Sequence, residues 1–436
     1  MFRTAEFVNL RRMQLLRALK TFPRSARYFY SAWALFWIGG EGILGVLFNI
    51  LLLRLSFGTE FIGSTGAIRM LVFAVSSLVA GYLGRNIGLK RTMTWGLIFV
   101  LLAAAGIPLL GLLPPGTRRI LVYAILLCRG FGAALFLVST YPYLAGAIPD
   151  ESISHAFSLH WILQPLSIFA GSLIAGMLPQ MFSSLTGRPM DGFVPYQLAL
   201  ISSPAILLLA LLVIRRVEEQ DQHITDEIKS IDVSDQSSII VILLCAPIIS
   251  MLAWSGRNGM DFFLNVYLDD VMNVATAKIG SLRAIGQIVA AISVAIIPPI
   301  VAKAGKYRSI PVANALSATC LFLFAIARNF YGIAVAYAGM MAFHTVAAAA
   351  SAAFGQMMVP VDKRPILSGM SNMAVGVGSA AISLAGGFLA GSVGFRVFFQ
   401  LSSAMIGASA VFFSIFYFKP KGEYRKLSVW HYRNRL

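Results

Sequence analysis

The sequence predicts an all-α membrane protein with twelve transmembrane helices in two parallel, pseudo-symmetric halves of six. Three observations lead to this fold class: the composition, the spacing of the apolar segments and an internal repeat. Of the 436 residues, 58% are apolar and only 12% are charged, whereas a soluble domain has about 25% charged residues. A surface with so few charges suits lipid, so the composition excludes a soluble enzyme, a disordered chain and a collagen-like chain.

Twelve apolar segments are long enough to cross a bilayer core of about 30 Å, which needs about 20 residues of helix. We expect spans at 30–53, 62–84, 92–113, 120–146, 156–180 and 197–214, and then at 238–267, 279–301, 309–327, 331–358, 366–391 and 395–418. The expected organisation is a basic N-terminal tail (1–27), a first six-helix half (28–214), a polar linker (215–237), a second half (238–418) and a basic C-terminal tail (419–436).

The net charge of +17 comes mainly from the two tails and from loops that share their side of the membrane. Basic residues concentrate on the cytoplasmic side of membrane proteins, so we expect an integral, multi-pass protein of the cell membrane with both termini in the cytoplasm. An anionic lipid surface accounts for this charge, and nucleic acid is not needed as a partner. The three cysteines, Cys128, Cys245 and Cys320, lie far apart inside apolar segments and are expected to be core residues.

The two halves resemble each other at a constant offset of 217 residues. The matched sets are Trp37, Gly39 and Gly42 with Trp254, Gly256 and Gly259; Ile62–Ser64 with Ile279–Ser281; and Gly88 and Arg91 with Gly305 and Arg308. Parallel repeats of this kind, related by an axis along the membrane normal, are typical of one large class of transporters. At the same offset, Glu41 of the first half corresponds to Asn258 of the second half.

The segment 81–91 resembles the loop signature of the major facilitator superfamily, roughly G-x-L-[AG]-D-R-x-G-R-[KR]-[RK]. The matching residues are Gly81, Leu83, Gly84, Gly88, Lys90 and Arg91, whereas Arg85 stands at the Asp of the signature and Asn86 at its Arg. Arg129, followed by several small residues, resembles an intramembrane Arg motif of the same superfamily, and the antiporter signature of the fifth span is absent. The resemblance implies a secondary transporter that works by alternating access. It also implies a cytoplasmic gate at Gly81, Gly84, Arg85, Gly88, Lys90 and Arg91, whose lock differs because Arg85 replaces the family's Asp.

Seven of the ionisable side chains inside the expected spans, where a charge costs at least about 2.5–3.5 kcal/mol, are candidates for a functional role. They are Glu41, Arg69, Arg129, Arg257, Asp261, Arg283 and His344. One hypothesis is that Glu41 and Arg129 couple transport to protons, and the alternative is that they form a permanent ion pair between two helices. Arg257 and Asp261, four residues apart on a helix, could neutralise each other; alternatively Asp261 pairs with Arg69, with Arg283 nearby, as an extracellular gate.

A central cavity lined by spans one, four, seven and ten is implied by the resemblance, and it includes Arg257 and His344. Further cavity candidates are Trp37, Asn49, Gln164, Trp254, Asn258 and Asn372, each of which could instead serve helix–helix contact. The surplus of basic over acidic groups in the spans favours an anionic or zwitterionic substrate.

The functional hypothesis is therefore a secondary active transporter of a small organic solute. One alternative is a proton-linked exporter of amphipathic drugs or lipids, and another is a solute-sensing receptor on a transporter scaffold. No Walker loop, zinc-protease motif or nucleophile elbow is present in the sequence, so we expect no enzymatic activity, no cofactor and no metal. The expected partners are the small-molecule substrate, membrane lipid and protons, and the expected state is a monomer.

Overall fold

A computed structural model describes residues 23–148, 150–219, 236–304, 309–358 and 364–418, and every regular element within these ranges is helical. Most of the N-terminal tail, most of the linker and the C-terminal tail lie outside the described residues. The all-α fold class predicted from the composition is confirmed.

The first half of the chain contains the expected spans. The first span is one continuous helical segment made of α2 (Arg24–Trp37), η1 (Ile38–Leu44) and α3 (Gly45–Arg54). The other spans are formed by α4 (Thr59–Ile87), α5 (Leu89–Gly106) with the 3₁₀ turn η2 (Ile107–Leu112), α6 (Pro115–Ala147), α7 (Asp150–Thr186), and α8 (Val194–Leu200) with α9 (Ser202–Ile214). The first helix begins six residues earlier than expected, because Ser25 is buried there and its hydroxyl lies 2.7 Å from the Tyr143 hydroxyl of α6.

The second half follows the same order. It consists of α10 (Gln236–Val266) with η3 (Tyr267–Val271), α11 (Thr276–Ala304), α12 (Ser309–Ile326), α13 (Phe330–Met358), α14 (Arg364–Ser392) and α15 (Phe395–Phe418). Ten helical segments among the described residues are long and apolar enough to cross a membrane. Helices α10 and α11 have 31 and 29 residues and occupy the positions expected for spans seven and eight, so the structure is consistent with twelve spans.

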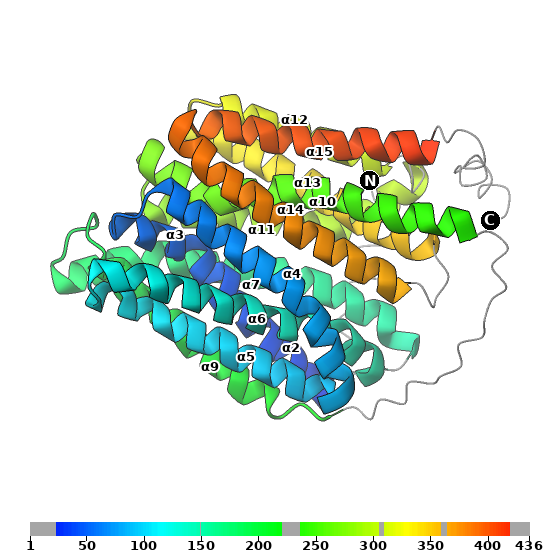
Figure 1. Ribbon diagram of the computed structural model, residues 1–436, viewed down its shortest axis with the longest axis horizontal. Coiled ribbons are helices and arrows are strands. Elements are labelled where there is room, and N and C mark those ends of the chain that lie inside the picture. Colours follow the sequence, from blue (N-terminus) through cyan, green and yellow to red (C-terminus); the bar gives the residue numbers. More distant parts are fainter. Residues whose placement is uncertain (1–22, 149, 220–235, 305–308, 359–363, 419–436) are drawn as a thin grey trace, which may run out of the picture. The chain divides into compact units, whose positions relative to one another are not determined.

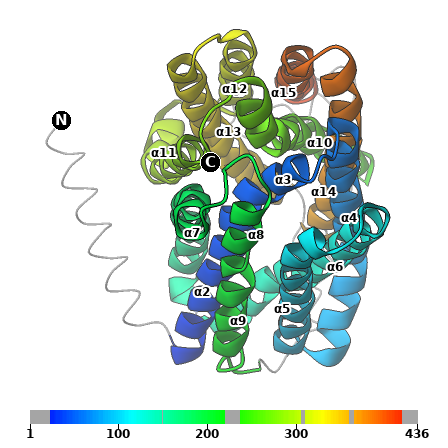
Figure 2. The same ribbon diagram turned by 90° about the vertical axis from the view of Figure 1, so that its left-hand side faces the viewer.

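The chain divides into two compact units. Unit 1 holds the described residues up to Leu47, Ser76–Met190 and those from Val194 to Glu219; unit 2 holds Phe48–Val75, Asp191–Phe193 and the described residues from Gln236 onward. In unit 1, α5 lies beside α6, and α2 lies beside α9 (Figures 1 and 2). In unit 2, α12 lies between α13 and α15, and α10 packs on α14 and α15. The segment 48–75, which follows Glu41 in the first half of the sequence, thus groups with the helices of the second half.

Candidate functional site

The candidate site in unit 1 is built on a break in the first helix. Residues 38–44 (IGGEGIL) form a seven-residue π-helix, which contains Glu41. Glycine weakens the regular α-helical ladder because it has the greatest backbone freedom to lose, and π segments inside α-helices often occur at functional sites. Two carbonyl groups of this wide turn accept hydrogen bonds from other helices: Gly39 from the Ser203 hydroxyl at 2.9 Å, and Gly40 from Arg129 at 3.3 Å.

Glu41 and Arg129 meet, as the sequence suggested for two opposite charges inside the spans. The Arg129 Nη2 atom donates to the Glu41 Oε1 atom at 3.0 Å. The side chain of Arg129 is 9% exposed, whereas that of Glu41 is 30% exposed. The pair is therefore asymmetric: the cation is enclosed by protein, and the carboxylate retains an open side.

The π-helix is held against α7 by two glycines that face each other. A Cβ atom on Gly42 would lie 2.7 Å from the Cα atom of Gly171, which is closer than real side chains approach. Only glycine at both positions permits this backbone contact, and small residues play the same role in other membrane helix pairs. The close approach fixes the position of Glu41 next to α7.

We expect Gly42→Ala to lower the thermal stability of the purified protein by about 1–3 kcal/mol, the usual cost of overpacking a core. The matched control is Gly40→Ala, two residues away in the same π-helix, because a Cβ atom there meets no atom within 4 Å. Thermal unfolding in detergent measures both variants. Equal melting temperatures for the two would show that the contact with Gly171 does not hold this helix in place.

An aromatic cluster extends from the acid along α2. Trp37 and Trp33, about one and two turns before Glu41, pack at 75° with ring centroids 5.5 Å apart, and His160 of α7 stacks on Trp33 at 3.9 Å. His160 is fully buried, and neither ring nitrogen bonds to a residue that the structure describes. His160 was not among the residues selected from the sequence, although, like His344, it is an ionisable group inside an expected span. Gln164, the next turn of α7, is half-buried.

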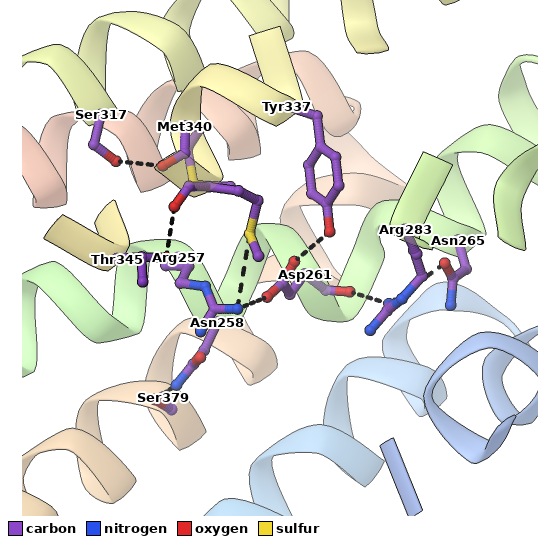
Figure 3. Close-up of polar contacts among 11 residues, drawn as sticks. Arg257, Asn258, Asp261, Asn265, Arg283, Ser317, Tyr337, Met340, Thr345 and Ser379 are labelled. Carbon is purple, nitrogen blue, oxygen red and sulfur yellow. Dashed lines mark hydrogen bonds and ion pairs between the residues drawn. The ribbon is translucent and has the colours of Figure 1, made fainter. Parts of the chain in front are cut away.

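The candidate site in unit 2 lies along α10 (Figure 3). Asp261 is paired with Arg257 at 2.9 Å, the first of the two arrangements predicted for it. The Tyr337 hydroxyl of α13 donates to Asp261 Oδ1 at 3.4 Å, and Arg283 of α11 donates to the Asp261 backbone carbonyl at 3.3 Å. Figure 3 shows Asp261 between the two guanidinium groups. Arg69 is half-buried on α4.

The remaining candidates of the second half surround Arg257. Its guanidinium lies over the Trp254 ring at 5.4 Å, and His344 contacts the same ring edge-on at 4.9 Å. Asn258, the repeat partner of Glu41, donates to the Ser379 hydroxyl of α14 at 3.0 Å. The structure thus brings Trp254, Arg257, Asp261 and His344 into one cluster, while Asn372 is an exposed residue of α14.

A buried ion pair that the sequence analysis did not select lies near the end of α10. Asp269 in the π-helix η3 binds Arg54, the last residue of α3, through two contacts of 2.8 Å. Asn49, a cavity candidate on α3, donates to the Phe262 carbonyl of α10 at 2.8 Å. Asp269 and Arg54 were overlooked because both fall at the ends of expected spans, where charges are common.

The loop signature forms the turn between α4 and α5. Gly84 is buried, Gly81 and Arg85 are exposed in the last turns of α4, and Gly88 has a φ of 95°, which favours glycine. The Lys90 backbone N–H donates to the Glu219 carboxylate at 3.1 Å, and Arg91 is exposed. Glu219 therefore places a negative charge at the N-terminus of α5, where helix dipoles favour one.

This combination of long apolar helices with buried charges, carried by two units, defines a polytopic membrane protein. The family model of the Major Facilitator Superfamily matches residues 31–357, and the chain belongs to that superfamily. No curated protein matches the sequence at a significant level.

Solved structures of transporters share the fold at low sequence identity. A bacterial homologue of the iron transporter ferroportin in an inward-facing state is 15% identical, with a TM-score of 0.64 over 89% of this chain and 98% of that one. The inward-open xylose transporter XylE from E. coli is 12% identical, with a TM-score of 0.67 over 92% and 98%. A POT family transporter in complex with a thioalcohol-conjugated peptide is 14% identical, with a TM-score of 0.68 over 92% and 99%.

Proposed function

We propose that this protein is a secondary active transporter that moves a small organic anion or zwitterion by alternating access and couples it to protons through Glu41 and Arg129. The observation that carries the proposal is the pair in the π-helix, with its enclosed cation and partly open carboxylate. The two six-helix halves, 28–214 and 238–418, would rock about a site near the midplane.

The coupling follows from the competition for Arg129. When Glu41 is ionised, its carboxylate neutralises Arg129 at 3.0 Å. When Glu41 takes up a proton, the attraction is lost, and a buried guanidinium without a counter-charge is costly. An anionic group of the substrate can then replace the carboxylate. Proton uptake at Glu41 and anion binding at Arg129 therefore favour each other, which is the requirement for proton-linked transport of an anion.

The fold does not limit the substrate to one class, since the similar solved structures include a xylose transporter and a transporter bound to a peptide. The charges of this chain are more informative. Within unit 2, two arginines and one aspartate form a buried cluster, and this surplus of positive charge supports an anionic or zwitterionic solute.

An exporter of amphipathic drugs or lipids is the second candidate. The observation that favours it is the aromatic cluster of Trp33, Trp37 and His160, because aromatic faces bind apolar and cationic groups. A cationic or lipid-like ligand would put this alternative first. A solute-sensing receptor, the candidate from another class, would bind a solute tightly without moving it across a sealed vesicle.

We also infer that the protein resides in the cell membrane as a monomer, contacts lipid along its apolar helices and has both termini in the cytoplasm. The basic tails, linker and loops support this orientation. Labelling of a cysteine introduced at the exposed residue Arg188 from outside intact cells, and of one at Arg85 only after the cells are broken, would agree with it. The reverse pattern would contradict it.

The test of the proposed function has two stages. Purified protein is first screened by thermal unfolding against anionic, zwitterionic and cationic solutes at about pH 5.5 and about pH 7.5, because a ligand that binds the folded state raises the melting temperature. The best solute is then offered to sealed proteoliposomes with and without an imposed pH gradient. We expect an anionic or zwitterionic ligand that stabilises more at the lower pH and accumulates only with the gradient. Accumulation that ignores the gradient would reject proton coupling.

A further inference from the structure

Arg283 is a buried cation whose hydrogen bonds go to neutral groups. The residue is 6% exposed, and its Nη1 atom donates to the Asp261 backbone carbonyl at 3.3 Å and to the Asn265 side-chain carbonyl at 3.5 Å (Figure 3). Among the residues that the structure describes, no carboxylate lies within 4.0 Å of the Arg283 guanidinium. Both of its hydrogen bonds are long for a charged donor, which prefers about 2.7–2.9 Å.

The nearest carboxylate is already used. Asp261 Oδ2 binds Arg257 at 2.9 Å, and Asp261 Oδ1 accepts the Tyr337 hydroxyl at 3.4 Å. Asp269 also lies near this end of α10 in the described part of the chain, but it is already paired with Arg54. Arg257, Asp261 and Arg283 therefore carry one positive charge in excess. A buried charge without a counter-charge is strongly destabilising, so the cluster is suited to accept an anion.

One edge of the Arg283 guanidinium, formed by Nε and Nη2, makes no hydrogen bond within the described part of the chain. A guanidinium offers two parallel N–H groups from Nε and Nη2, and this fork matches the two oxygens of a carboxylate or phosphate. In Arg283 only Nη1 donates a hydrogen bond within the described part of the chain; Nε is buried and makes none. The edge that recognises oxyanions is thus the unused one.

We propose that Arg283, held by Asp261 and Asn265 beside the Arg257–Asp261 pair, binds a carboxylate or phosphate group of the transported solute other than the one that replaces Glu41 at Arg129. The proposal rests on the proposed function and deepens it, because it predicts a second anionic group on the substrate and assigns that group to a particular residue of unit 2. It also gives Asp261 a role: its carboxylate neutralises Arg257 and leaves Arg283 for the ligand.

The probes are sodium acetate and sodium phosphate, compared with sodium chloride at the same ionic strength. They are added at about pH 7.5, at which the proposed function keeps Arg129 paired with Glu41. The readout is thermal stabilisation of the purified full-length protein. In the wild type we expect acetate or phosphate to stabilise more than chloride. In Arg283→Gln we expect the midpoint concentration to rise at least about tenfold, because the neutral amide loses the charge-assisted hydrogen bonds to the anion. Arg328→Gln is the matched control, because Arg328 is exposed in the same unit.

Two further variants keep the test decisive if Arg283→Gln does not fold. Asp261→Asn removes the competing carboxylate and should strengthen the acetate or phosphate response several-fold. Arg283→Lys keeps the charge without the fork and should retain a weaker response. A purely structural role for Arg283 predicts neither change. Three results would overturn the assignment. The first is a wild type that is stabilised equally by the three anions, and the second is stabilisation by acetate that survives in Arg283→Gln. The third is an Arg283-dependent stabilisation by chloride alone.

Transport measurements decide whether the anion that binds at Arg283 belongs to the substrate. Proton-driven uptake of an organic anion into proteoliposomes that Arg283→Gln abolishes would support substrate binding at this residue. Uptake that is the same in the wild type and in Arg283→Gln would overturn the inference while leaving the proposed function intact. An Arg283-dependent response to acetate in a protein that moves no solute would support the anion site and reject the transport proposal.

Discussion

Replacing Glu41 by Gln is expected to reduce proton-driven accumulation of the solute to the level of protein-free vesicles. The neutral amide cannot exchange a proton, and it leaves Arg129 without the counter-charge that now lies 3.0 Å away. Glutamine imitates the protonated carboxyl, and a buried cation favours an anion at any pH. The variant should therefore bind an anionic ligand at about pH 7.5 as tightly as the wild type binds it at about pH 5.5. Exchange of labelled for unlabelled solute, which needs no net proton movement, should persist.

The Glu41→Gln variant needs a control substitution at another glutamate, outside the site. Glu60 at the start of α4 is exposed, so Glu60→Gln removes the same charge without touching the site and should accumulate solute at the wild-type rate. Accumulation, exchange and pH-dependent ligand stabilisation are measured on the same preparations. If Glu41→Gln accumulates solute normally but unfolds at a lower temperature, the pair is a structural link between helices and coupling must lie elsewhere.

The spans were predictable because the bilayer imposes one rule on every segment: about 20 apolar residues with all backbone groups bonded internally. The helices therefore begin and end close to the expected residues, as α12 and α15 show. The meeting of Glu41 with Arg129 was foreseeable for the same reason, because opposite charges inside spans seek each other. The i,i+4 spacing likewise indicated the Arg257–Asp261 pair.

Other features depend on tertiary contact and left little signal in the sequence. The seven-residue π-helix around Glu41 needs Ser203 and Arg129 to bind the carbonyls that it releases. The contact between Glu219 and Lys90 joins residues far apart in sequence, so no local pattern announces it. The grouping of 48–75 with the second half's helices is a property of packing, which periodicity does not encode.

The segment 48–75 meets α10, η3 and α14 along what we call the seam, formed by Arg54 with Asp269, Asn49 with Phe262, and Gly63 with Gly387. A Cβ atom on Gly63 would lie 2.7 Å from the Cα atom of Gly387, so the helices touch there through their backbones. Because the segment belongs to the first six-helix half by sequence, rocking of the halves would have to open this seam. Arg54 and Asp269 form its only buried ion pair among the residues described.

Arg54→Gln is expected to open the seam at neutral pH and to let it close again in acid. The Asp269 side chain is 5% exposed, and without its cation the buried carboxylate costs about 3–5 kcal/mol. Asp269 lies beyond the membrane-spanning part of α10, and burial raises the pKa of its carboxyl, while Arg54 opposes this rise and Asp270 and Asp191 add to it. Removing Arg54 therefore raises this pKa further. The closed seam then binds the proton more tightly than the open one, so lowering the pH favours closure.

Spin labels on Gly58→Cys and Ala275→Cys, both exposed positions of unit 2, would report the distance across the seam after the three native cysteines have been replaced. Arg54→Lys should keep the wild-type distance, because it keeps the cation. Asp270→Asn, next to Asp269 but exposed, is the matched control and should not open the seam. If the distance in Arg54→Gln equals the wild-type value at both neutral and acidic pH, the glycine contacts hold the seam closed and the ion pair does not. Gly63→Ala would then be the substitution that opens the seam.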